Sequence, residues 1–390
     1  MVIFVNISQI LFSLLQAGLY DEPVEAKIVN ELNAEILERL YTISKAHDLA
    51  HILAVALSKC GKLGDDLVSK KFQIKAVSAV SHYERARYDL QTICDALEQA
   101  QIPYIPLKGS VLRQYYPEPW MRNSCDIDVL VRKENLTTAM QVLQDVLGYT
   151  LRKEGTHEFS FCSPSNVCVE MHFDLIEDGR VNAAGEILKD VWNKARLKEN
   201  TKFHYLLSDE QFYYYHIAHM AKHFEQGGCG IRPFIDLWIM DAGKQIDWEK
   251  RNQLLQKGKL LKFARAAKKL SKIWFENEHY DHVARIMEEY VIRGGIFGTK
   301  STRVTLHQKQ KGSKWRYALW RILPPYSTIK NIYPILQSHP WMTPFAQIYR
   351  WVKIVVDGKA RNAFEELTYS QNISRERLQD IRLLFSELGL

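Results

Sequence analysis

The sequence changes its periodicity twice along its length, and this limits the folds that the chain can adopt. Before about residue 100, apolar residues such as Ile36, Leu40 and Ile43 recur three or four positions apart, which predicts helices. Between 101 and 207, short runs of β-branched residues alternate with loops and helical segments, and helical spacing returns after 208. We therefore expect an α+β fold, with a small mixed sheet that has helices on one side and helical regions before and after it.

The expected boundaries divide the chain into three parts: an N-terminal helical region (1–98), a core (99–207) and a C-terminal helical, basic domain (208–390). The core is expected to contain these strands and helices: strands 103–107, 126–131, 159–162 and 167–175, an edge strand 203–207, and helices 111–116 and 134–147. Ser208 followed by Gln211 predicts a capping box, which would begin a helix running to about residue 224.

Composition places the chain among globular proteins, since 46% of its 390 residues are hydrophobic and 25% are charged. Its six cysteines form no CxxC pair, which favours reduced thiols over a zinc ribbon. No Lys or Arg precedes Lys27, and no run approaches the ~20 apolar residues of a membrane span. We expect a cytoplasmic protein with no membrane partner.

Charge is distributed unevenly along the chain. Residues 1–200 hold 22 Lys and Arg against 27 Asp and Glu, whereas residues 201–390 hold 30 against 18. The segment 250–272 alone carries nine basic residues interleaved with leucines. Such a basic amphipathic face could bind RNA, but the favoured interpretation is a solvated surface over an apolar stripe.

Two carboxylates occupy one predicted strand, at Asp126 and Asp128. Residues two apart on a strand point to the same face, so Ile127 would pack behind them. Carboxylates held this close need a cation between them, and hard oxygen ligands suit Mg²⁺. Taken alone, such a pair is more often a solvated edge strand than a metal site.

Two further features favour the metal interpretation. Gly109 and Ser110 lie between a predicted strand and a helix, where glycine lets a phosphate approach free backbone N–H groups. In the strand 167–175, Glu170 and Asp174 share one face, so either could bring a third carboxylate to the pair; Glu170 is the first choice. Three carboxylates beside a phosphate cradle are typical of two-metal phosphoryl transfer.

These motifs resemble those of a largely uncharacterised bacterial family within the DNA polymerase β-like nucleotidyltransferase superfamily. The resemblance covers most of the chain. It rests on the following segments: Leu107-Lys108-Gly109, Leu112, Tyr115-Tyr116-Pro117, Arg122, the run 126–131, Glu170-Met171-His172, His216, His219, His223, Gly230, Arg232, Asp236 and residues 323–350 with Tyr333-Pro334 and Pro344.

The resemblance implies a five-stranded nucleotidyltransferase core that binds a nucleoside triphosphate (NTP) with two Mg²⁺ ions, Mn²⁺ being an alternative. Asp126 and Asp128 would hold both ions, and Glu170 would hold one of them and help to activate the acceptor. Gly109 and Ser110 would contact the β- and γ-phosphates. The nucleotidyl group would pass to a hydroxyl or phosphate of a small molecule, sugar or peptide, with release of pyrophosphate. The fifteen residues between Ser110 and Asp126 exceed the spacing usual in the superfamily.

Three cations lie near this cradle: Lys108, Arg113 and Arg122. Each could bind phosphate, as a point charge or as a guanidinium fork. For Lys108 a merely solvated position is equally favoured. For Arg122 the alternative is a structural salt bridge to a nearby acid.

A histidine stripe on the helix after Ser208 carries the remaining chemistry. His216, His219 and His223 are spaced i, i+3, i+7, so they share one helix face. We expect hydrogen bonding at the domain junction, with His219 and His223 toward the nucleotide; packing alone is a second interpretation. A third is a metal-dependent phosphohydrolase centre completed by Asp236 or Asp241. A non-catalytic nucleotide-binding module remains a further alternative, and Arg232 with Asp236 is expected to form an i, i+4 pair.

Overall fold

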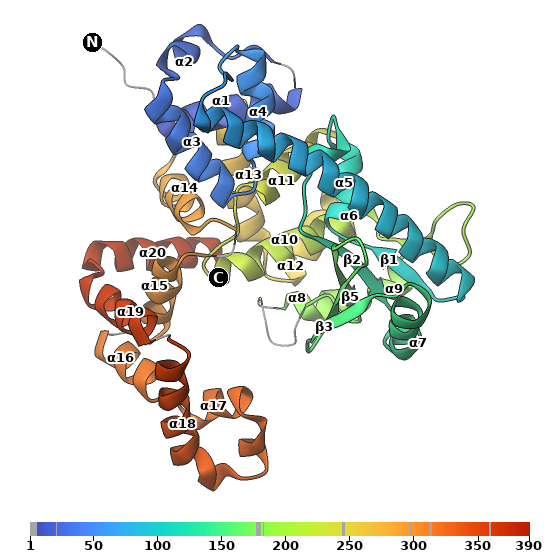
Figure 1. Cartoon of the computed structure of the whole chain (residues 1–390), viewed down its shortest axis with the longest axis vertical. Coiled ribbons are helices and arrows are strands. Elements are labelled where there is room, and N and C mark those ends of the chain that lie inside the picture. Colours follow the sequence, from blue (N-terminus) through green and yellow to red (C-terminus); the bar gives the residue numbers. More distant parts are fainter. Residues whose placement is uncertain are drawn as a thin grey trace.

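The computed structural model describes residues 6–20, 22–176, 181, 183–243, 246–296, 298–311, 314–358 and 360–390. In chain order, a five-stranded sheet follows a helical N-terminal part and precedes a longer helical C-terminal part; in space it lies to one side of these helices (Figure 1). This confirms the α+β fold expected from the sequence. The N-terminal helices are α1 (Ile7–Tyr20), α2 (Ala26–Glu31), α3 (Ala34–Ala46), α4 (Ala50–Lys59) and α5 (Leu67–Gln99).

The sheet has the strand order β1-β2-β5-β4-β3. Its strands are β1 (Tyr104–Pro106), β2 (Asp126–Val131), β3 (Thr150–Glu154), β4 (Glu158–Cys162) and β5 (Cys168–His172). β2 pairs in parallel with β5, and the other neighbours are antiparallel. The parallel pairing sets Asp128 opposite Glu170. The register therefore brings acidic residues of two strands side by side.

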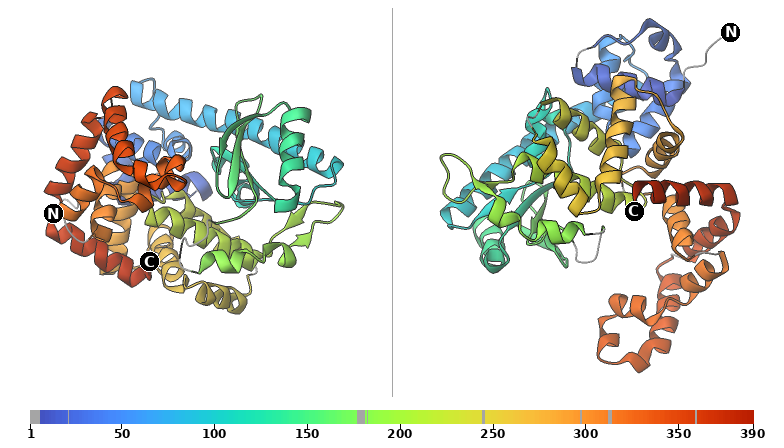
Figure 2. Two further views of the ribbon diagram at one scale, coloured as in Figure 1. Left: turned by 90° about the horizontal axis from the view of Figure 1, so that it is seen from below. Right: turned by 180° about the vertical axis from the view of Figure 1, so that it is seen from behind.

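The helices α5 and α7 (Leu136–Gln141) lie against one face of the sheet, as Figures 1 and 2 show, and an apolar core fills the space between them. Val129 and Val169 from the strands pack with Ile93 of α5 and Leu143, each fully buried. Because strand side chains alternate between faces, Asp128 next to Val129 on β2 and Glu170 next to Val169 on β5 point to the other face of the sheet. This packing fixes the polar face of β2 and β5.

Two sequence expectations differ from the structure. The fifth strand is β3 rather than 203–207; the latter segment gives only β7 (Tyr205–Leu206), which pairs with β6 (Arg196–Leu197) in a separate two-stranded sheet. Residues 150–154 are mostly exposed and polar, so no apolar alternation indicated a strand there. The expected helix 134–147 changes after α7 into a π-helical turn at Val142–Val146, and it ends, as expected, at Gly148 with φ 69°.

The polar face of the sheet is met by α10 (Asp209–Glu225), which begins with the predicted capping box of Ser208 and Gln211. The next helices are α11 (Arg232–Gly243), α12 (Trp248–Lys257), α13 (Leu261–Glu276) and α14 (His282–Gly294). Residues of α10 to α14 share one hydrophobic core with α1 to α4. The two flanking regions thus meet each other as well as the sheet.

The basic segment 250–272 forms α12 and α13, and its apolar residues Leu255, Phe263 and Leu270 are buried. This agrees with a basic surface over an apolar stripe. The remaining α-helices are α6 (Gly109–Leu112), α8 (Ala184–Leu188), α9 (Val191–Lys194), α15 (Lys300–Lys311), α16 (Lys314–Ile322), α17 (Tyr326–Ile332), α18 (Thr343–Val356), α19 (Ala360–Asn372) and α20 (Arg375–Leu388). Among helices of the described ranges, none combines the length and apolar character needed to cross a membrane.

Candidate active site

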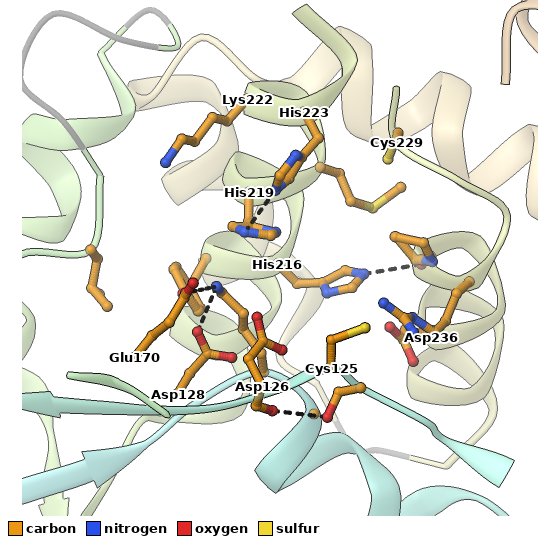
Figure 3. A pocket seen from close by; sticks show the side chains of 18 of the residues that line it. Cys125, Asp126, Asp128, Glu170, His216, His219, Lys222, His223, Cys229 and Asp236 are labelled. Atoms are coloured by element: carbon orange, nitrogen blue, oxygen red, sulfur yellow. Dashed lines mark hydrogen bonds and ion pairs between the residues drawn. The ribbon is translucent and has the colours of Figure 1, made fainter. Parts of the chain in front are cut away.

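A pocket lies between the polar face of the sheet and the helices α10 and α11 (Figure 3). Its lower wall comes from β2, β5 and the turn after β1, and its upper wall from the histidine face of α10. The lining includes these polar residues: Lys108, Arg122, Ser124, Asp126, Asp128, His157, Glu158, Glu170, His172, Tyr215, His216, His219, Lys222, His223, Arg232 and Asp236.

Asp126, Asp128 and Glu170 all line this pocket, as Figure 3 shows. Ile127, between the two aspartates, is 1% exposed and packs in the core behind them. Asp174, the second choice for a third acid, is not among the described lining residues, and its carboxylate accepts the backbone N–H of Leu175 at 2.9 Å. The structure thus brings together the three carboxylates that the sequence singled out first.

The two aspartates differ in their partners. Asp128 accepts hydrogen bonds from Lys108 Nζ at 2.7 Å and from His172 Nε2 at 2.9 Å. Although burial favours its neutral form, the charge of Lys108 and the hydrogen bond from His172 hold the pKa of Asp128 well below its usual value. Within the described chain the carboxylate of Asp126 has no hydrogen bond or ion pair, and burial with the nearby charge of Asp128 raises its pKa to about 6. Asp126 therefore has no direct cationic partner among the described residues, although the charges of Lys108 and Arg232 act on it.

Lys108 owes its position to an unusual backbone conformation. Its φ is 45° and its ψ is −120°, and Ser110 N–H bonds to Leu107 O at 3.1 Å across a tight turn. A residue other than glycine in this region costs about 1–3 kcal/mol. The turn directs the Lys108 side chain into the pocket, where its Nζ also lies 3.9 Å from Glu170 Oε2.

Gly109 also lines the pocket, and it has no room for a side chain. A Cβ atom there would lie 2.9 Å from Ser124 Oγ. Arg113 stabilises this turn with two hydrogen bonds. Its Nε donates to Gly109 O at 3.0 Å, and its Nη2 donates to Ser124 Oγ at 3.1 Å. Arg113 and Ser110, both in the described ranges, do not line the pocket, and Ser110 Oγ is buried without a hydrogen-bond partner. Their phosphate contacts stay predictions.

Arg122 lines the pocket but its guanidinium is paired with Asp236, from Nε at 2.6 Å and from Nη2 at 2.8 Å. Tyr116 donates to the same carboxylate at 2.7 Å, and Asp236 is fully buried. The structure thus shows the salt-bridge alternative for Arg122. The expected Arg232–Asp236 pair is wrong, because Arg232 instead contacts Asp48 at 3.2 Å.

The three histidines of α10 all line the pocket, opposite the carboxylates (Figure 3). His219 Nε2 and His223 Nε2 lie 3.1 Å apart, while His216 Nε2 hydrogen-bonds Pro233 O at 3.0 Å. Burial lowers the pKa of His223 to about 4 and holds that of His219 well below its usual value, so both rings are neutral at pH 7.

The metal alternative for this stripe is not borne out. Two acids were expected to complete this metal site. Asp236 forms an ion pair with Arg122, and Asp241 pairs with Lys268 at 2.9 Å. Within the described ranges, the groups that could hold a metal ion are instead Asp128, Glu170 and His172, and His157, Glu158 and His172.

Sequence reasoning did not assign a role to several pocket residues. His172 shares a strand face with Glu170, and this spacing could have identified it. Glu158 lies opposite His172 in the antiparallel register of β4 and β5, which no local pattern reveals. Tyr215 lines the pocket with a buried hydroxyl that has no hydrogen-bond partner.

Comparison with known proteins agrees with this geometry. A family model described as "Uncharacterised nucleotidyltransferase" matches residues 33–276, which include β1 to β5 and α10 to α13 and hence both walls of the pocket. No curated protein and no solved structure matches the chain. Because the matched region covers more than half of the chain and carries the acidic strands, the chain belongs to this family of nucleotidyltransferases.

Proposed function

We propose that the protein transfers a nucleotidyl group from an NTP to an acceptor hydroxyl or phosphate in a Mg²⁺-dependent reaction that releases pyrophosphate. The observation that carries this proposal is the position of Asp126, Asp128 and Glu170 on one pocket wall, next to Gly109. Family membership supports the reaction class.

The donor set fits a hard divalent cation. Three carboxylates from adjacent strands offer the oxygen ligands that Mg²⁺ prefers, and Asp126 has no partner among the described residues. The Lys108 ammonium lies between Asp128 and Glu170, which shows how strongly these groups attract positive charge. Asp126 and Asp128 would hold two ions and Glu170 one of them. Bound Mg²⁺ would offset the charge of the phosphates and stabilise the attacking and leaving oxygens.

The protein groups around the carboxylates suit a triphosphate. Gly109 lines the pocket without a side chain, and Lys108 supplies a cation next to it. His219 and His223, uncharged at neutral pH, can hydrogen-bond a base or sugar without adding charge. Glu170, which belongs to β5, would orient the acceptor and receive its proton.

A labelling experiment tests the proposal. The protein is incubated with Mg²⁺, a metabolite or peptide extract and each NTP labelled at either the α- or the γ-phosphate. We expect the α-label on an acceptor and the γ-label in pyrophosphate. Glu170→Gln should abolish both, whereas the matched control Asp174→Asn should keep them. Release of inorganic phosphate alone would instead indicate a phosphohydrolase, and binding without turnover would indicate a non-catalytic module.

A further inference from the structure

A second group of side chains lies at the edge of the pocket, next to the three carboxylates. It consists of His157, Glu158 and His172, and we name it the His–Glu–His cluster. Glu158 Oε2 lies 3.2 Å from His157 Nε2 and 3.5 Å from His172 Nδ1. All three residues line the pocket, and both histidines are buried. The proposed nucleotidyl transfer does not use this cluster.

The hydrogen bonding of His172 leaves one ring nitrogen facing a carboxylate. Its Nε2 donates to Asp128, which when ionised can only accept, so in a neutral ring Nδ1 carries a lone pair. This Nδ1 is buried without a hydrogen-bond partner and is directed at Glu158 Oε2. A lone pair and a carboxylate oxygen repel each other. The arrangement is therefore stable only if a cation lies between them, either a proton on Nδ1 or a metal ion.

The spacing of two of the three ligand pairs is compatible with a metal ion. In tetrahedral coordination with bonds of about 2.0–2.1 Å, neighbouring ligand atoms lie about 3.3 Å apart. The two distances from Glu158 Oε2, 3.2 and 3.5 Å, fall on either side of this value. Two imidazoles and one carboxylate form a set that suits Zn²⁺ and related ions rather than Mg²⁺. We propose that the His–Glu–His cluster binds one Zn²⁺-class ion at a site separate from the three-carboxylate site.

The surroundings of the cluster resemble those of known zinc sites in one respect. Histidines that bind zinc usually donate their other ring N–H to a carboxylate, which fixes the ring and its tautomer. Asp128 does this for His172. Three protein ligands leave a fourth position open, as in catalytic zinc sites. Lys222 Nζ donates a hydrogen bond to His157 Nε2 at 3.4 Å, so the ammonium would have to release this nitrogen when a metal ion binds, and it would then lie close to an anionic group on the metal.

This inference does not depend on the proposed function, and its test measures metal rather than turnover. The full chain, freed of metal and then dialysed against Zn²⁺, is analysed for bound zinc, and Zn²⁺ affinity is measured by titration calorimetry. We expect one zinc per chain and a loss of affinity of at least about 100-fold in His157→Ala. Glu158→Gln should also weaken binding, while the exposed control His282→Ala should not change it.

Two further measurements separate a loss of zinc binding from poor folding and from binding at the Mg²⁺ site. Co²⁺ substituted for Zn²⁺ should give the visible absorption bands of a tetrahedral site, and Glu158→Gln should remove them even if His157→Ala folds poorly. Asp126→Asn should retain zinc, which separates this site from the Mg²⁺ site. Absence of stoichiometric zinc, or equal affinity in wild type and both cluster variants, would overturn the proposal and assign a proton to His172 Nδ1.

Discussion

The Lys108 ammonium lies 2.7 Å from Asp128 Oδ1, so the chain itself supplies a cation to the site that we propose for Mg²⁺. The strained turn at Lys108 places this side chain in the pocket. When metal ions and an NTP bind, the same ammonium would pass from the carboxylates to the phosphates. Lys108 would thus provide positive charge to the carboxylates before ligands bind and to the phosphates afterwards.

Lys108→Met should destabilise the metal-free protein. Asp128 and Lys108 are 2% and 18% exposed, and removing one partner of a buried pair costs about 3 kcal/mol or more. Mg²⁺ should raise the melting temperature of the variant more than that of wild type, because it replaces the missing charge. Thermal unfolding with and without Mg²⁺ measures this. Lys250→Met, which breaks an exposed pair, is the control; equal stability of wild type and Lys108→Met would contradict the account.

Gly109→Ala should impair NTP binding more than stability. The new Cβ would press on Ser124 Oγ, which is held by Arg113 and by the backbone of Asp126, and it would cover the backbone that we assign to phosphate. We expect a loss of NTP affinity of about tenfold or more, which corresponds to about 1.4 kcal/mol. Gly185→Ala has open space around its Cβ and is the control. Unchanged affinity would remove Gly109 from the site.

The Arg122–Asp236 pair should act on stability rather than on substrate affinity. Arg122→Met removes one partner of this buried pair, and we expect a loss of about 3 kcal/mol, measured by denaturant unfolding. Arg122→Met combined with Asp236→Leu should recover part of this loss, because no charge is then left unpaired. Arg87→Met, at an exposed pair, should change little. Unchanged stability with a raised KM for NTP would instead assign Arg122 to phosphate.

Stability should fall in mild acid because of His47. Burial lowers its pKa from 6.5 to about 4, although the hydrogen bond to Ile292 O acts in the opposite direction. In the neutral state the ring also accepts from Ile231 N–H. The unfolded chain binds the extra proton first, so stability is full above pH 6.5 and is lost as the pH falls toward 4, by up to about 3 kcal/mol. Unfolding free energies measured across this range should show a shallower slope in His47→Gln. An identical slope would contradict the assignment.

Features that depend on local periodicity were predictable from the sequence. The alternation in β2 and β5 gave the shared face of Asp126, Asp128 and Glu170 because side-chain direction on a strand follows residue number. The capping box at Ser208 is likewise a local pattern.

Features that depend on distant pairing were not predictable. Arg122 and Asp236 are 114 residues apart, and nothing in either segment indicates that they meet. The same holds for Glu158, which reaches the pocket only through the register of β4 and β5. β3 was missed because its residues are mostly exposed and form no apolar pattern.

The central claim is that Asp126, Asp128 and Glu170 hold Mg²⁺ against an NTP. Titration calorimetry with each non-hydrolysable NTP, with and without Mg²⁺, tests it most directly on wild type, Asp126→Asn, Glu170→Gln and the control Asp174→Asn. We expect Mg²⁺-dependent binding in wild type and Asp174→Asn, and affinity lower by at least about 100-fold in the other two. Binding that is the same without Mg²⁺, or the same in all four proteins, would contradict the account.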